Sequence, residues 1–145
     1  MKLRLGPLIV LLVSTCVIAG DYDTTKLAEG SIWTGTYKIT NKKGIVFSSG
    51  IQIKILKRDK TNFVGEWSQS ANDVSFEIKG SVSSNRLSFK FTRELKGDPS
   101  TGAVGGRSAA GTIVTRDGKE VITGTTVTEG KPNLAGEWEA ELKKD

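Results

Sequence analysis

One short pattern recurs six times along this chain, and it constrains the fold more than any other feature. In each copy a glycine lies midway between two residues, nearly all apolar, and the positions in between are mostly Thr, Ser, Glu or Lys. The six glycines are Gly35, Gly65, Gly80, Gly111, Gly124 and Gly136. Because successive side chains of a β-strand point to opposite faces, each glycine shares one face with its apolar neighbours. The pattern therefore predicts strands with one buried face and one face in water.

A glycine in the middle of an inward-facing row needs a physical reason, because it weakens the strand that contains it. In a small closed sheet, a glycine allows sharp coiling and leaves room for a large side chain on a neighbouring strand. Six such positions, spread along the chain at one per strand, therefore predict a sheet that is strongly curled.

Strand-forming residues and turn signals continue from Ser31 to the C-terminus, and no segment there has the periodicity of a helix. Short turns join most of the expected strands, so consecutive strands should be antiparallel neighbours. The expected strands span residues 31–40, 44–56, 61–70, 73–82, 85–95, 107–116, 119–128 and 134–143. The sequence thus predicts an all-β fold, a single antiparallel eight-stranded meander that closes into an up-and-down β-barrel. A β-sandwich of two sheets fits the same periodicity and is the alternative.

The first 20 residues have the layout of a secretory signal peptide, with Lys2 and Arg4 ahead of a short apolar run. That run is too short for a membrane span, which needs about 20 apolar residues. We therefore expect a signal peptide over residues 1–20, a lead-in segment over 21–30 and the β-barrel domain over 31–145. The expected location is secreted or periplasmic, and a lipoprotein anchored at Cys16 is the alternative.

The residue counts exclude several kinds of chemistry. The chain has 21 Lys and Arg, 16 Asp and Glu, one Cys and no His. Without His there is no His-based triad, and a single Cys cannot build a disulfide scaffold or a four-Cys zinc site. No complete phosphate loop and no Gly-x-Ser-x-Gly nucleophile elbow occur either. We therefore expect a protein that is not an enzyme and that has no metal site and no cofactor.

Positive charge is concentrated in residues 38–60, where Asp59 is the only acid. Aromatic platforms for stacked bases do not alternate with these charges, so we expect no nucleic-acid partner. A weak contact with an anionic surface is the partner that this stretch indicates. The residues expected to make it are Lys42, Lys43, Lys54, Lys57, Arg58 and Lys60.

The segment from Trp33 to Tyr37, the glycine-centred strands and the closing Gly136-Glu-Trp138 together resemble the calycin-type barrels, the lipocalins and avidins. The resemblance covers the layout of residues 31–145. It departs from the lipocalin pattern, because Gly30 lies three residues before Trp33 rather than two. What the resemblance implies is a barrel and a ligand-binding function, with no specific ligand.

Most aromatic side chains of the expected strands, Phe47 among them, have inward parity, and so do Ile45 and Ile51 of the second strand. Arg93 continues the inward face of Phe89 and Phe91, where it could receive a carboxylate or phosphate group. We therefore predict an exported, non-catalytic protein that holds a small apolar or amphipathic ligand inside the barrel. The expected ligand-binding residues are Trp33, Tyr37, Trp67, Phe89, Phe91, Arg93 and Trp138. A protein–protein interaction module, such as an envelope-associated inhibitor or adaptor with a filled core, is the alternative.

Overall fold

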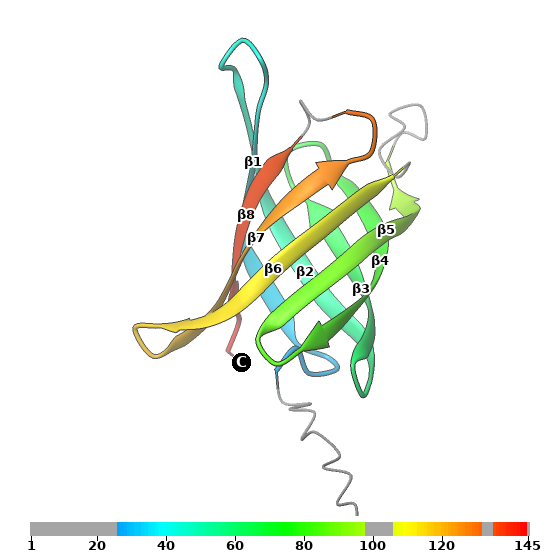
Figure 1. Cartoon of the computed structure of the whole chain (residues 1–145), viewed down its shortest axis with the longest axis vertical. Helices are drawn as coiled ribbons and strands as arrows, with labels where there is room; N and C mark the ends of the chain where they lie inside the picture. Colours follow the sequence, from blue (N-terminus) through cyan, green and yellow to red (C-terminus); the bar gives the residue numbers. More distant parts are fainter. Residues whose placement is uncertain (1–25, 98–105, 132–134, 145) are drawn as a thin grey trace, which may run out of the picture.

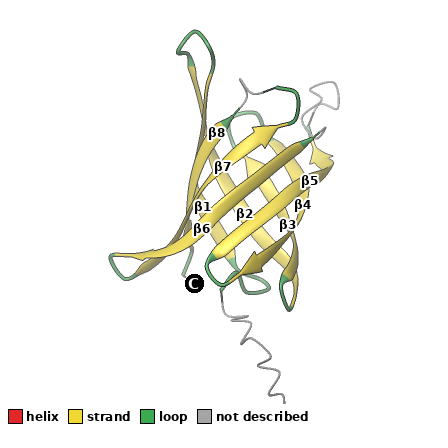
Figure 2. Ribbon diagram, viewed as in Figure 1, coloured by secondary structure: helices red, strands yellow, loops and turns green. Residues whose placement is uncertain are grey.

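The computed structural model describes residues 26–97, 106–131 and 135–144, so the expected signal peptide and Cys16 lie outside the described residues. The described chain consists of strands joined by turns and loops (Figures 1 and 2). The strands are β1 (Ile32–Thr40), β2 (Val46–Asp59), β3 (Asn62–Gln69), β4 (Val74–Ser83), β5 (Arg86–Lys96), β6 (Arg107–Arg116), β7 (Lys119–Thr128) and β8 (Gly136–Leu142). These confirm the expected strands, although β2 runs further than predicted.

The strands form a closed barrel in the order β1-β2-β3-β4-β5-β6-β7-β8, each antiparallel to the next. Closure comes from β8, which pairs with β1 from Trp33 opposite Leu142 to Ile39 opposite Gly136. The up-and-down barrel expected from the sequence is therefore confirmed, and the sandwich alternative is wrong. Full closure removes free sheet edges along most of the wall, because each paired strand has two neighbours.

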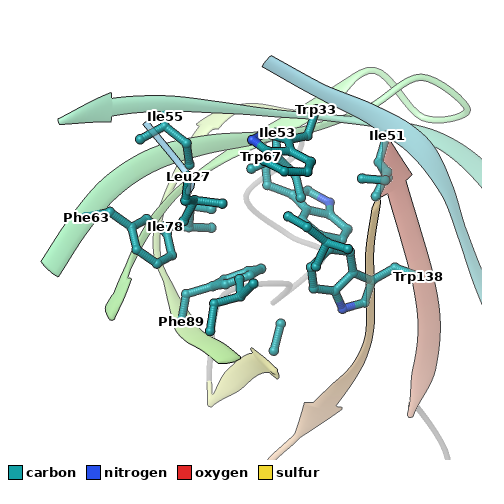
Figure 3. Close-up of a cluster of buried hydrophobic side chains, with 14 of the residues drawn as sticks. Leu27, Trp33, Ile51, Ile53, Ile55, Phe63, Trp67, Ile78, Phe89 and Trp138 are labelled. Atoms are coloured by element: carbon teal, nitrogen blue, oxygen red, sulfur yellow. The ribbon is translucent and has the colours of Figure 1, made fainter. Parts of the chain in front are cut away.

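The two ends of the barrel differ in what lies across them. At the base, where the chain enters β1, Leu27 is buried in the core, and the Gly30 N–H donates to the Ile55 carbonyl at 2.8 Å. Figure 3 shows Leu27 among Ile55, Phe63 and Ile78. The lead-in segment therefore contributes an apolar plug to the base. The opposite end, where β1 connects to β2 and β3 to β4, is called the mouth below.

The β1–β2 hairpin continues past the mouth, as Figure 1 shows in cyan. Hydrogen bonds between β2 and the end of β3 begin at Gly50, whose carbonyl accepts from the Ser70 N–H, so residues 46–48 of β2 pair with β1 alone among the described residues. Ile45 and Phe47 are consequently exposed. The inward position predicted for them is wrong, because the alternation of faces continues there but no interior remains for one face to enter.

Glycines leave the space that the large rings occupy. A Cβ atom placed on Gly124 would lie 2.6 Å from Cε2 of Trp138 and would also collide with the Ala110 carbonyl. A Cβ atom on Gly136 would lie 2.5 Å from Cε2 of Tyr37. The expectation that these glycines make room for large neighbours is therefore confirmed at both positions.

We predict that Gly124→Ala lowers the free energy of unfolding by about 1–3 kcal/mol, because the added methyl group overpacks the wall against Trp138. Urea unfolding followed by tryptophan fluorescence measures the change. Gly50→Ala is the matched control, since its Cβ would meet only the Ser70 hydroxyl group, which can rotate away. Equal losses in the two variants would contradict the steric role of Gly124.

Candidate functional site

The centre of the barrel is filled by aromatic rings. Trp67 makes edge contacts with Tyr37, Phe91 and Trp138 at centroid distances of 5.5–5.7 Å, and a tilted contact with Phe89 at 6.0 Å. Such separations are those of rings in direct contact, which adds to the stability that burial alone provides. The predicted ligand-binding residues that the structure brings together inside are Trp33, Tyr37, Trp67, Phe89, Phe91 and Trp138. All of them except Trp33 make ring contacts with other members of the set, and a hollow suited to a ligand lies toward the mouth.

Arg93 lies on the outside of the barrel, so the inward position expected for it is wrong. The register of β4 and β5 shifts between Glu77 and Ile78, which places an extra residue, Thr92, between Phe91 and Arg93. A bulge of this kind reverses which face the following residues point to. Arg93 accordingly forms an exposed ion pair with Glu77, with Nη2 and Oε2 3.2 Å apart.

Glu77 lies at the centre of a small network of polar side chains on the outer surface. Its carboxylate accepts a 2.9 Å hydrogen bond from the Thr92 hydroxyl group and also faces Lys79 and Arg93. The Thr92 hydrogen bond and the two cations hold the pKa of the Glu77 carboxyl below its usual value, against the opposing effect of desolvation. Because these side chains face water, the network contributes little to stability.

A layer of buried polar groups separates the aromatic centre from the mouth. The Tyr37 hydroxyl group and the Thr126 hydroxyl group lie 3.2 Å apart and share a hydrogen bond. The Ser49 hydroxyl group donates to the Gly50 carbonyl at 2.8 Å and accepts from the Ala71 N–H at 3.1 Å. The buried polar residues are Ser49, Gln69, Ser75 and Thr126. Such groups are stable inside a protein only when they are hydrogen-bonded, so the mouth end is built for polar contacts.

Arg107, the first residue of β6, extends across this polar layer. Its guanidinium carbon lies 4.3 Å from the centre of the Phe91 ring, 5.2 Å from Tyr37 and 5.7 Å from Phe76. The Gln69 amide oxygen, when turned toward the arginine, accepts from Nη2 at 3.3 Å and from Trp67 Nε1 at 3.1 Å. The guanidinium group therefore makes cation–π contacts with the aromatic centre, and it carries more N–H donors than the Gln69 oxygen alone can accept.

The charge of Arg107 has no ion-pair partner among the described residues. The side chain is half-buried, and desolvation lowers its pKa from the usual value, which the nearby Tyr37 only partly offsets. Arginine keeps its proton at neutral pH in spite of such shifts. The mouth consequently contains a partly desolvated positive charge whose partners, within the described part of the chain, are aromatic rings and an amide and not a carboxylate.

A hollow of about 730 Å³ lies beside Arg107, at the point where the pairing of β5 with β6 ends among the described residues. Pairing of β5 with β6 ends at Lys90 opposite Ser108, whereas β5 continues to Lys96. Two cations and one carboxylate are among its lining residues, together with apolar and small side chains. The lining residues are Lys90, Phe91, Gly106, Arg107, Ser108, Val127, Thr128, Glu129, Gly130 and Ala135.

Arg107 is not among the ligand-binding residues predicted from the sequence, although the alternation of faces in its strand indicates an inward side chain. Arg107 has the same parity as Ala109 and Ile113, which are both buried, so the alternation in β6 already directs its side chain inward. The alternation of Arg93 with Phe89 and Phe91 is equally regular, and the sequence pattern does not reveal the bulge at Thr92. The inward-pointing arginine is therefore Arg107 of β6 and not Arg93 of β5.

The basic residues of the 38–60 stretch do not gather in one patch. Lys42 and Lys43 lie at the tip of the β1–β2 hairpin, while Lys57 and Lys60 lie near the base. Among the described residues no group of His, Cys, Asp and Glu side chains could hold a metal ion. The same part of the chain contains no helix with the length and apolar character of a membrane span.

The hydrogen bond between Tyr37 and Thr126 gives a test of the polar layer. We predict that Tyr37→Phe lowers the free energy of unfolding by about 1–3 kcal/mol, because it leaves the buried Thr126 hydroxyl group without its partner. Thr126→Val is the matched change on the other side. The double variant should lose less than the sum of the two single losses, and strict additivity in urea unfolding would contradict the coupling.

No protein-family model and no curated protein sequence matches the chain. Among solved structures, apo shwanavidin is similar at 16% identity with a TM-score of 0.47, over 79% of this chain and 98% of that one. The structure described as EF1p2_mFAP2b bound to DFHBI is similar at 16% identity with a TM-score of 0.49, over 84% and 97%. These likenesses are too distant to tell what this chain binds. The closed eight-stranded meander itself is the calycin-type layout that the sequence resembles.

Proposed function

We propose that this chain is an exported, non-catalytic binding protein that holds a small amphipathic anion at the mouth of its barrel. The observation that carries the proposal is the half-buried Arg107, which has ring faces and an amide as partners but no carboxylate among the described residues. The pattern of a signal peptide in residues 1–20 supports export.

An anion supplies the negatively charged hydrogen-bond acceptor that Arg107 lacks among the described residues. A guanidinium group carries five N–H donors in a planar fork, and a carboxylate or phosphate accepts two of them side by side. Contacts with the Phe91 and Tyr37 rings and with the Gln69 amide hold the guanidinium group in place, so little side-chain freedom is lost when an anion binds. Partial removal of water from the site makes the attraction stronger than it would be on the surface.

The hollow beside Arg107 suits the rest of an amphipathic ligand. Phe91, Val127 and Ala135 supply apolar surface, and the backbone of β5 beyond Lys90 is not covered by β6. Ligand pockets typically combine such apolar walls with one or two well-placed polar groups. Glu129 on the same wall disfavours a second negative charge on the ligand, so a single anionic group with an apolar body is the expected chemistry.

We predict that Arg107→Met abolishes retention of this ligand. Native mass spectrometry of the protein purified from its source, followed by organic extraction, should show a small anionic compound on the wild type and none on the variant. In titrations with decanoate, the loss of a charge-assisted pair should raise Kd by roughly 10- to 100-fold.

Arg93→Met is the matched control, because Arg93 is an exposed arginine of the neighbouring wall whose charge is already paired with Glu77. It should leave both retention and the decanoate affinity unchanged. Binding of decanoate that is equally tight in wild type and Arg107→Met would overturn the proposal, and so would equal affinity for decanol, which lacks the charge.

A further inference from the structure

Exposed apolar side chains gather at the mouth of the barrel. Of the large apolar side chains that the structure describes, six are exposed, and five of these lie on the β1–β2 hairpin or on strand ends at the mouth. Leu56 is the exception and lies toward the base, at the bulge of β2. The five are Ile45 (63% exposed), Val46 (55%), Phe47 (42%), Leu95 (42%) and Val127 (53%). Such clustering marks a surface that contacts an apolar medium or a partner.

These side chains are distributed around the whole circumference. They belong to the hairpin leading into β2, to β5 and to β7, which are separated by three, two and three steps in the closed order of eight strands. Leu95 and Val127 point away from the interior, because their neighbours Glu94 and Thr126 are more buried. A compact protein partner would cover one side of the barrel, whereas a plane facing the mouth meets all of these side chains at once.

The β1–β2 hairpin also exposes apolar side chains on more than one side. Val46 points to the face opposite that of Ile45 and Phe47, so both faces of the hairpin expose apolar side chains near its tip. Figure 1 shows this hairpin rising above the rest of the mouth. A partner that docks on one face would leave the other face in water, while a lipid surface surrounds both.

The positive charge of the hairpin indicates which kind of surface it contacts. Lys42 and Lys43 lie at the turn of the hairpin, and the chain has no acid between positions 38 and 58. Cations beside exposed apolar side chains are the pattern with which proteins bind membranes that contain anionic lipids. The same two lysines oppose pairing of the hairpin with its copy in a second molecule, because like charges would be brought together.

The backbone limits how deep this contact can be. Residues 46–48 of β2 pair only with β1 among the described residues, so one edge of the hairpin needs other hydrogen-bond partners. An open strand edge is not stable in the hydrocarbon core, but water and lipid headgroups can satisfy it. The hairpin therefore fits the headgroup region and not a membrane span.

We propose that the mouth of the barrel docks on an anionic lipid surface, with the β1–β2 hairpin in the headgroup region and the outer wall at Leu95 and Val127 at its boundary. Docking in this orientation turns the Arg107 site toward the membrane. The inference stands on the exposed side chains and the lysines alone, so it remains valid if the mouth proves to bind no ligand.

The test places an environment-sensitive fluorophore at either end of the same strand. In a Cys16→Ser background, Val46→Cys carries the probe at the mouth and Leu56→Cys carries it toward the base, where Leu56 is also exposed. The labelled chains are mixed with vesicles of phosphatidylcholine alone or with 30% phosphatidylglycerol. We expect a blue shift and a rise in emission for the probe at position 46 with the anionic vesicles only, and no response at position 56.

A double variant, Lys42→Gln with Lys43→Gln, tests the charge. Removing both lysines should weaken vesicle binding roughly 25-fold, at about fivefold for each cation near an anionic surface, and added salt should also weaken it. The variant should leave the affinity of the Arg107 site for decanoate unchanged, which separates failure of this inference from failure of the proposed function.

Three outcomes would overturn the inference. One is a probe at position 46 that does not respond to anionic vesicles. Another is an equal response at positions 46 and 56, which would mean that the chain attaches without a preferred end. The last is a probe at position 46 that responds to increasing protein concentration in the absence of lipid, which would identify a second copy of the chain as the partner.

Discussion

Contact between large aromatic rings and positions that lack a side chain holds this barrel in its closed form. Trp67 lies at the centre of the ring cluster, and Trp138 and Tyr37 fit against Gly124 and Gly136 of the wall. A closed sheet of eight strands has just enough interior for side chains to fill it. Because the interior is used for packing, binding chemistry is confined to the ends of the barrel and to its outer surface.

The two ends have different roles for this reason. Leu27 closes the base with an apolar side chain, whereas the mouth carries the buried hydroxyl groups and Arg107. Among the described residues, the bulge in β5 and the early end of its pairing with β6 leave a hollow beside Phe91. Buried polar groups, the hollow beside Arg107 and most of the exposed large apolar side chains of the described residues therefore occur at the same end, and both proposals made above concern this end.

How far the sequence predicts the site depends on whether alternation of faces is interrupted. It correctly places Tyr37 and Phe91 inside, because their strands are regular up to those positions. It fails at Arg93, because the extra residue Thr92 changes the face and no residue type signals the bulge. It also fails at Phe47, since alternation predicts a face and not how far the barrel wall extends.

The amino-acid sequence alone determined the strand order, the antiparallel meander and the glycine-centred curl, because side-chain alternation and short turns are local properties. Only the tertiary structure decided which arginine turns inward, that the centre is filled, and that the basic residues of the 38–60 stretch separate to opposite ends of the barrel. Those outcomes depend on register and on where pairing stops. Both are set by contacts between residues distant in sequence, such as Phe91 with Arg107 and Ile39 with Gly136.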